Sequence, residues 1–167
     1  MDQIINKVAQ SGLITINLED YYDSGTREFI DLKEHLYEGL ILRERDFRDF
    51  VKSNDWAFYQ DANVAIDITT DAIVPAWAFM LVASAVSPFA KTIIKGSLAD
   101  LNKHLYTLAL HKIDLNQFQD RLVIVKGCSN VPVPESTYVE LCNMLQPVVK
   151  SLSYGEACSK VPLYKRR

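Results

Sequence analysis

A chain of 167 residues is long enough for one globular domain with a buried core, and its 49% hydrophobic and 23% charged residues exclude a disordered chain. A net charge of −3, with the terminal Lys165–Arg167 as the only cationic cluster, excludes an electrostatic surface for nucleic acid. Three widely spaced cysteines, an odd number, exclude a disulfide framework and favour a reducing, cytoplasmic setting.

Residues 72–90 resemble a membrane span in length, because AIVPAWAFMLVASAVSPFA carries no charge. The segment is rich in Ala and Ser, contains Pro75 and Pro88, and is flanked by the charged residues Asp71 and Lys91. These features favour a helix that is buried on most sides. The opening MDQIINKVAQ also lacks the apolar core of a signal peptide, so we expect no association with membranes.

The first half of the chain predicts a helix, two strands and a longer helix. Apolar residues at helical spacing over 4–10 stop at a Ser-Gly pair, which is a typical helix end. Alternation of apolar and polar residues predicts a half-buried strand over 13–18, and a second strand is expected over 27–32. An apolar stripe with i,i+4 charge pairs predicts a helix from about Lys33 to Lys52.

The second half repeats a strand followed by a helix three times. The strands are expected over 64–69, 91–96 and 121–127, and the helices over 72–90, 97–113 and 134–152. Ser97 and Asp100 form a capping signal at the start of the second of these helices.

This alternation predicts an α/β fold with a mostly parallel central sheet and helices on both faces. The two N-terminal strands either extend this sheet or form a small antiparallel flank. No repeat of solenoid length, linker or low-complexity tract appears, so we expect a single domain over residues 1–167.

A ligand site is expected where parallel strands end and the following helices begin. Two of these ends read Lys-Gly followed by a small polar residue, at Lys95 and Lys126. A lysine, a glycine and nearby helix amides favour an anion. The candidate ligand-binding residues are Thr69, Thr70, Lys95, Ser97, Lys126 and Ser129. The alternative interpretation is purely local, with glycines ending strands, Ser97 capping a helix and the lysines in solvent. Walker and GxGxxG patterns are absent, so no nucleotide is implied.

Asp71 and two cysteines are candidates for chemistry. Asp71 either caps the following helix or lies as a free carboxylate in the crevice. Cys128 follows a strand near a helix start, where positive charge and amides lower a thiol pKa. Cys158, with Glu156, lies in a C-terminal segment that is apolar enough to dock on the body, whereas Cys142 lies on a core stripe. Two thiols predict no metal site by themselves.

The histidines offer these thiols no evident base. His104 and His111 lie on the polar flank of their helix, and His35 has no partner that the sequence reveals. A Cys–His nucleophile pair is therefore disfavoured.

Several strings resemble a family of bacterial proteins that is catalogued as domain of unknown function 2480. They are DAIVPAWAFMLVAS, VKGC, VPVPESTYVEL, YGEACSKVPLYK, INKVAQSGLITINLEDYY and GLILRERDFR. Family members tend to have Cys-Ser before the DAIVP string, where this chain has Ile68 and Thr69. A three-cysteine cluster in the family would match Ile68, Cys128 and Cys158, so this chain lacks one ligand. The resemblance implies no established activity. Family members are encoded near iron–sulfur assembly proteins, which implies an accessory role only by association.

Three functional hypotheses remain open, and they do not decide whether the protein is an enzyme. The first is a cytoplasmic accessory or ligand-binding domain that holds a small anion between Lys95 and Lys126. The second is a thiol- or metal-dependent protein that uses Cys128 and Cys158, with no cofactor identified. The third is a structural scaffold that forms a homodimer through the helix at 72–90.

Overall fold

The computed structural model describes residues 12–127 and 129–167, which divide into two compact units. One unit consists of Ser24–Asn102 and is called the inserted unit here. The other consists of Met1–Asp23 and Lys103–Arg167 and is called the terminal unit. The predicted helix over residues 4–10 lies outside the described residues.

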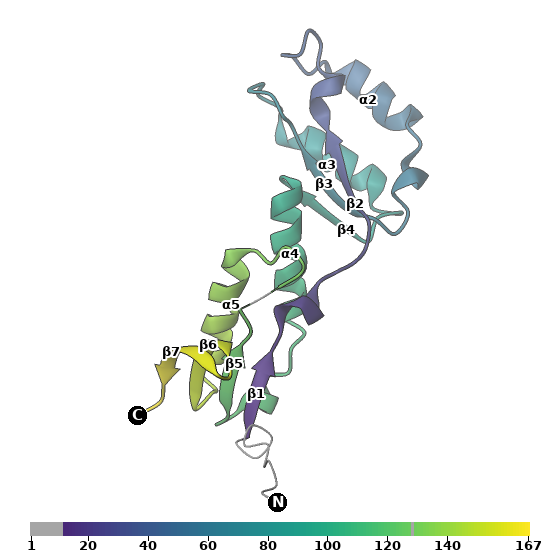
Figure 1. Cartoon of the computed structure of the whole chain (residues 1–167). Helices are drawn as coiled ribbons and strands as arrows, with labels where there is room; N and C mark the ends of the chain where they lie inside the picture. Colours follow the sequence, from purple (N-terminus) through teal and green to yellow (C-terminus); the bar gives the residue numbers. More distant parts are fainter. Residues whose placement is uncertain (1–11, 128) are drawn as a thin grey trace, which may run out of the picture. The chain divides into compact units, whose positions relative to one another are not determined.

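The inserted unit is a three-stranded parallel sheet with two α-helices (Figure 1). The strand order is β2-β3-β4. Its elements are β2 (Arg27–Asp31), the 3-10 helix η2 (Leu32–His35), α2 (Glu44–Ser53), the 3-10 helix η3 (Trp56–Tyr59), β3 (Asn63–Asp67), α3 (Ala76–Val86) and β4 (Thr92–Lys95).

Both helices of the inserted unit pack on the same face of its sheet. Val64 and Ile66, which alternate onto one face of β3, belong to a single core cluster with residues of α2 and α3. The buried helix residues of this cluster are Phe47, Val51, Ala78, Val82 and Val86. The strands lie in chain order, so successive right-handed crossovers bring both helices to one face.

The terminal unit is a four-stranded mixed sheet in the order β1-β5-β6-β7. The first three strands are parallel, and β7 is antiparallel to β6. Its elements are β1 (Leu13–Ile16), the 3-10 helix η1 (Leu18–Tyr21), α4 (Leu98–Leu110, which begins in the inserted unit), the 3-10 helix η4 (Leu115–Phe118), β5 (Leu122–Val125), α5 (Glu135–Leu145), β6 (Ser151–Glu156) and β7 (Ser159–Lys165). Residues of α4 and α5 share one core cluster with Val123 and Val125.

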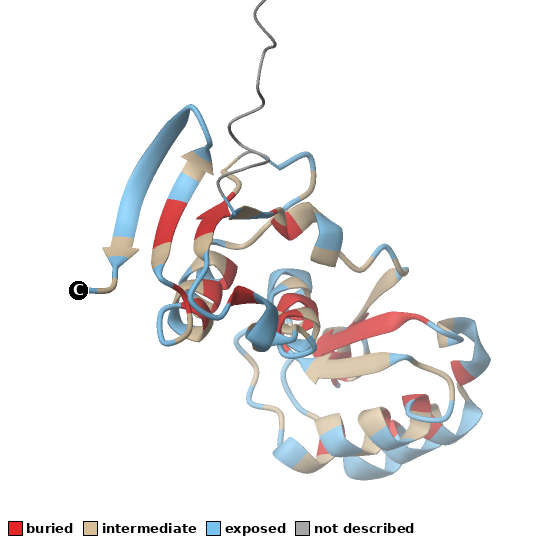
Figure 2. Ribbon diagram, turned by 90° about the horizontal axis from the view of Figure 1, so that it is seen from below, coloured by how far each residue is buried: buried red, intermediate tan, exposed pale blue. Residues whose placement is uncertain are grey.

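The hairpin of β6 and β7 closes one edge of this sheet. Figure 2 shows β7, next to the C-terminus, as almost wholly exposed, whereas β6 has a buried middle. Tyr164 packs on the core, but Val161 and Leu163 are exposed. Pro162 lies within β7 and pairs with Ser153. The expected docking of the C-terminal segment therefore takes the form of an added strand.

The two units repeat each other, which the sequence analysis missed. Adding 59 to residue numbers takes η3 (Trp56–Tyr59) to η4 (Leu115–Phe118) and α3 (Ala76–Val86) to α5 (Glu135–Leu145). The backbone agrees in detail. Asp61 has a φ of 58° and Asp120 a φ of 55°, and each donates its amide to a carbonyl at 2.9 Å, that of Phe89 or Val148.

The first strands of the two units also correspond, with a different shift. Adding 14 takes Asn17 and buried Leu18 to Asp31 and buried Leu32. Asn17 and Asp31 each accept a hydrogen bond from the amide two residues later, which starts a 3-10 helix. The terminal unit is therefore interrupted after its first strand by a complete second copy of the same arrangement.

The α/β class and the predominance of parallel strands are confirmed, with differences in arrangement. The strands form two sheets instead of one central sheet, and the antiparallel pairing is C-terminal. Both N-terminal strands pair in parallel. That the chain behaves as one domain stays a prediction.

Prolines explain why two helices are shorter than predicted. The helix expected over 134–152 ends at Leu145, before Pro147, and residues from Ser151 form a strand instead. The helix expected over 72–90 begins at Ala76, since Pro75 disfavours a helical conformation in the residue before it. It ends at Val86, before Pro88.

Replacing Gly155 by Ala should destabilise the terminal unit. Gly155 has a φ of +113°, and an added Cβ would lie 2.7 Å from the carbonyl oxygen of Ser159. We expect a loss of about 1–3 kcal/mol in the free energy of unfolding, measured by urea denaturation. Gly39→Ala is the control, because Gly39 has a φ of +70° but no atom within 4 Å of an added Cβ. Equal losses in both variants would contradict a steric role for the close contact.

Candidate functional site

The strand ends of the inserted unit bring two carboxylates and a lysine side by side. Asp31 ends β2, Asp67 ends β3 and Lys95 ends β4. Asp31 and Asp67 are partners in the strand register. Lys95 Nζ lies 2.9 Å from Asp67 Oδ1, which makes a direct ion pair across neighbouring strands.

Asp31 holds the loop that follows β3. Its carboxylate accepts hydrogen bonds from the Thr69 amide at 3.2 Å and the Thr69 hydroxyl at 2.5 Å. The Lys33 amide donates at 3.0 Å, and Lys33 Nζ lies 3.4 Å away. Burial raises the pKa of Asp31, but the hydrogen bonds from Thr69 and Lys33 outweigh it, so the pKa is lowered overall.

At the strand ends of the inserted unit, these charged and polar side chains are therefore paired with one another. Lys95 forms an ion pair with Asp67, and the Thr69 hydroxyl donates a hydrogen bond to Asp31. Ser97 exchanges hydrogen bonds with Asp100, which confirms the predicted capping of α4. The geometry therefore favours the local interpretation for Thr69 and Ser97.

Thr70 and Asp71 are exposed in the segment before α3. Pro75 occupies the N-cap of α3, so the interpretation of Asp71 as the cap of that helix is wrong. The physical reason is the proline, which prevents the helix from extending back to Asp71. A catalytic role for Asp71 stays a prediction.

The corresponding loop of the terminal unit holds the carboxylate of Glu19. Glu19 Oε1 accepts a hydrogen bond from the backbone amide of Asn130, and its other oxygen accepts one from Asn17 Nδ2 at 3.3 Å. The Asn130 amide and the Asn17 side chain lower the pKa of Glu19, and the positive charge of Lys126 contributes in the same direction. The Ser129 side chain forms a hydrogen bond within its own loop, in which its hydroxyl donates to the carbonyl of Val131 at 2.8 Å.

Gly127 in this loop is required by a close aromatic contact. A Cβ at Gly127 would lie 2.9 Å from Cζ of Tyr154, and the Tyr154 hydroxyl donates to the Gly127 carbonyl at 3.3 Å. Tyr138 packs edge-on against the Tyr154 ring, with 5.8 Å between centroids. The predicted close approach at this glycine is thus made by a tyrosine of the same chain.

Lys95 and Lys126 belong to different sheets. Lys95 ends β4 of the three-stranded sheet, and Lys126 follows β5 of the four-stranded sheet. We expected both lysines at the edge of one sheet, and the division of β4 and β5 between two sheets contradicts this expectation. A ligand shared between them stays a prediction.

The cysteines lie in different environments. Cys142 packs against the core of the terminal unit, as predicted, and Cys158 is exposed between β6 and β7, two residues after Glu156. Cys128 lies outside the described residues, and a meeting of Cys128 with Cys158 stays a prediction. Among the described residues, no group of three or more His, Cys, Asp or Glu side chains is placed to hold a metal ion.

Two histidines have partners that the sequence analysis did not find. His111 Nε2 lies 3.3 Å from Glu140 Oε1, and Thr107 Oγ1 donates to Glu140 Oε2 at 2.7 Å. His35 stacks on Phe50, with 3.4 Å between ring centroids. Burial lowers the pKa of His35, and nearby Glu34 opposes this shift. Both contacts join separate elements, so no local sequence pattern signals them.

The family model described as protein of unknown function (DUF2480) matches residues 2–166. No curated protein and no solved structure matches the chain. Within residues 12–127 and 129–167, no helix has the length and apolar character needed to cross a membrane.

The Asp31 network predicts a pH-dependent loss of stability in Asp31→Ala. The pKa of Asp31 is lower in the folded protein than in the unfolded chain. The ionised carboxylate therefore stabilises the fold at pH values above the unfolded-state pKa. This stabilisation is lost as the pH falls through the folded-state pKa. We expect the variant to unfold about 1–2 kcal/mol more easily at pH 7 in urea titrations. The difference from the unmodified protein should narrow below about pH 4. Asp71→Ala, at an exposed carboxylate, is the control. A pH-independent loss would contradict the role of the charge.

Proposed function

The chain belongs to the DUF2480 family, and from this premise we propose that it is a cytoplasmic accessory protein whose terminal unit binds a small anion. The proposed site is the loop after β5, at Lys126 and the amide of Asn130. One observation carries the proposal. The loop already binds an anionic group, because the Asn130 amide donates to the carboxylate of Glu19, and the positive charge of Lys126 acts on the same carboxylate.

The chemistry of this contact suits a small anion such as phosphate or a carboxylate. Backbone amides and a lysine are common anion ligands, and they do not require a particular base or sugar. Glu19 acts as an internal ligand that a soluble anion would replace. We place the site at an exposed loop, which a soluble ligand can reach.

Comparison of the two units supports the terminal unit as the site. Adding 59 takes Asp67 to Lys126 and Lys95 to Tyr154, so the charge at the end of the middle strand is reversed between the units. In the inserted unit an aspartate neutralises the lysine across the sheet. In the terminal unit the corresponding neighbour is an uncharged tyrosine, which leaves Lys126 better suited to an external anion.

The thiol hypothesis draws less support from the described residues. Cys158 is exposed at the turn of a hairpin, and no described cluster suits a metal. Cys128 corresponds to Thr69 of the inserted unit and falls within the proposed loop. A thiol role, and an accessory role in iron–sulfur assembly, stay predictions.

A second proposed function is that of a structural scaffold, which forms a homodimer through α3. This helix and its flanks carry no charge from Ala72 to Ala90, and Ile73 and Met80 are 91% and 70% exposed. The corresponding helix α5 carries Glu135 and Glu140. An exposed apolar surface without charges is typical of an interface.

Phosphate titration tests the anion site. In Glu19→Gln the competing carboxylate is gone, so phosphate should raise the melting temperature by about 3 °C or more at roughly tenfold excess over its Kd. The unmodified protein should show a smaller rise at matched ionic strength. Adding Lys126→Ala to Glu19→Gln should abolish the rise, whereas Lys95→Ala is a control that should keep it. If Lys126→Ala leaves the rise unchanged, the anion binds elsewhere.

Light scattering after size-exclusion chromatography tests the dimer. We expect the mass of a dimer for the unmodified protein and of a monomer for Met80→Glu, because a buried unpaired carboxylate opposes association. Val139→Glu is the matched control, since Val139 is the exposed residue of α5 that corresponds to Met80. A monomeric unmodified protein at high concentration would end this proposal.

A further inference from the structure

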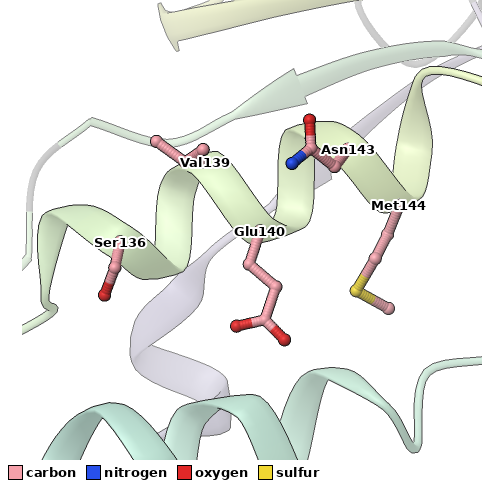
Figure 3. Close-up of a pocket in the computed structure, with 5 residues that line it drawn as sticks. All are labelled: Ser136, Val139, Glu140, Asn143 and Met144. Atoms are coloured by element: carbon pink, nitrogen blue, oxygen red, sulfur yellow. The ribbon is translucent and has the colours of Figure 1, made fainter. Parts of the chain in front are cut away.

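We propose that a groove beside α5 binds a small aromatic molecule with an N–H group, of the indole class. The groove has a volume of about 550 Å³ and is lined by Ser136, Val139, Glu140, Asn143 and Met144 (Figure 3). Figure 3 shows Ser136, Glu140 and Met144 pointing from α5 toward the neighbouring helix. The volume falls in the usual range for small-molecule sites. The site is separate from the proposed anion loop and does not depend on it.

The internal repeat explains why this groove exists. Adding 59 takes Trp77 of α3 to Ser136 of α5. In the inserted unit the indole of Trp77 fills the space between α3 and α2, with Phe47 edge-on at 5.9 Å between centroids. Arg48 lies over the Trp77 ring at 5.5 Å. In the terminal unit a small hydroxymethyl group, that of Ser136, stands at this position and lines the groove.

The neighbours of Ser136 match the chemistry of an aromatic ring. The side chain of Val139 is apolar, and thioethers such as that of Met144 make favourable contacts with aromatic rings. Phe47 and Arg48 of the inserted unit correspond to Tyr106 and Thr107 of α4. The cation that lies over the indole of Trp77 is therefore replaced by a hydroxyl, which favours a neutral ring.

Glu140 supplies the polar contact that selects an N–H donor. Its two oxygens are held in place by Thr107 at 2.7 Å and His111 at 3.3 Å. A carboxylate has about four acceptor positions, so further positions remain for a ligand N–H. The fixed negative charge disfavours anions in this groove. The two proposed ligand sites thus differ in chemistry, since the loop accepts an anion and the groove accepts a neutral N–H donor.

Indole itself is the probe that tests the groove. In two-dimensional NMR titrations, millimolar indole should shift the amide signals of Ser136 and Val139 and the methyl signal of Met144. 1-Methylindole, which lacks the N–H group, should bind about tenfold more weakly, because a hydrogen bond to a charged acceptor is lost. This comparison uses the unmodified full chain. Absence of groove shifts with indole, or equal binding of the two compounds, would overturn the proposal.

Two substitutions complete the test. Ser136→Trp restores the ring that the inserted unit carries, so it should abolish indole binding and raise the melting temperature. Ser84→Trp is the matched control at an exposed position of α3, and it should leave indole binding unchanged. If Ser136→Trp does not fold, Glu140→Gln serves instead and should reduce the difference between indole and 1-methylindole. Indole binding that survives Ser136→Trp unchanged would place the ligand elsewhere. Binding of N-acetyltryptophanamide without binding of indole would assign the groove to a protein partner and overturn the small-molecule proposal.

Discussion

The parallel pairing of β1 with β5 is the contact on which the terminal unit depends. It joins Leu13 to Leu122, so the whole inserted unit lies in the loop that this pairing closes. Closing a long loop costs conformational entropy, but the cost grows only slowly with loop length. The inserted unit contains all its own strands within one continuous segment. Glu19 follows β1 in the chain, so this pairing also brings Glu19 within hydrogen-bonding distance of the Asn130 amide. The contact in the proposed anion loop therefore forms only when β1 is paired with β5.

The two units show how one arrangement can be kept while its surface chemistry diverges. The buried positions Val82 and Val86 of α3 correspond to buried Leu141 and Leu145 of α5, so the core pattern is retained. The strand ends differ, with an Asp67–Lys95 ion pair in one unit and a hydrogen bond from the Asn130 amide to Glu19 in the other. Packing constrains a core more tightly than it constrains a loop, so the two units differ most in their loops and grooves, where function resides.

Local sequence patterns predicted the helices and strands better than they predicted how the strands are arranged into sheets. Alternation and capping signals located most strands and the start of α4, because these depend on neighbours in the chain. They did not reveal that β4 and β5 belong to different sheets, since strand pairing is non-local. The repeat was detectable in principle, because Gln60-Asp61 and Pro75 recur at the same spacing as Gln119-Asp120 and Pro134. Salt-bridge partners such as Asp67 for Lys95 depend on which strands are neighbours and where they end, which the sequence does not specify.

The placement of Pro162 in β7 has a consequence for self-association. β7 is the last strand of its sheet, and a proline lacks the amide hydrogen that a continuous ladder requires. Lys160 and Lys165 add positive charge on either side of it. An outer strand with an interrupted donor row and like charges is a poor template for another chain. These features disfavour amyloid-like growth from β7, even though its apolar side chains Val161 and Leu163 are exposed.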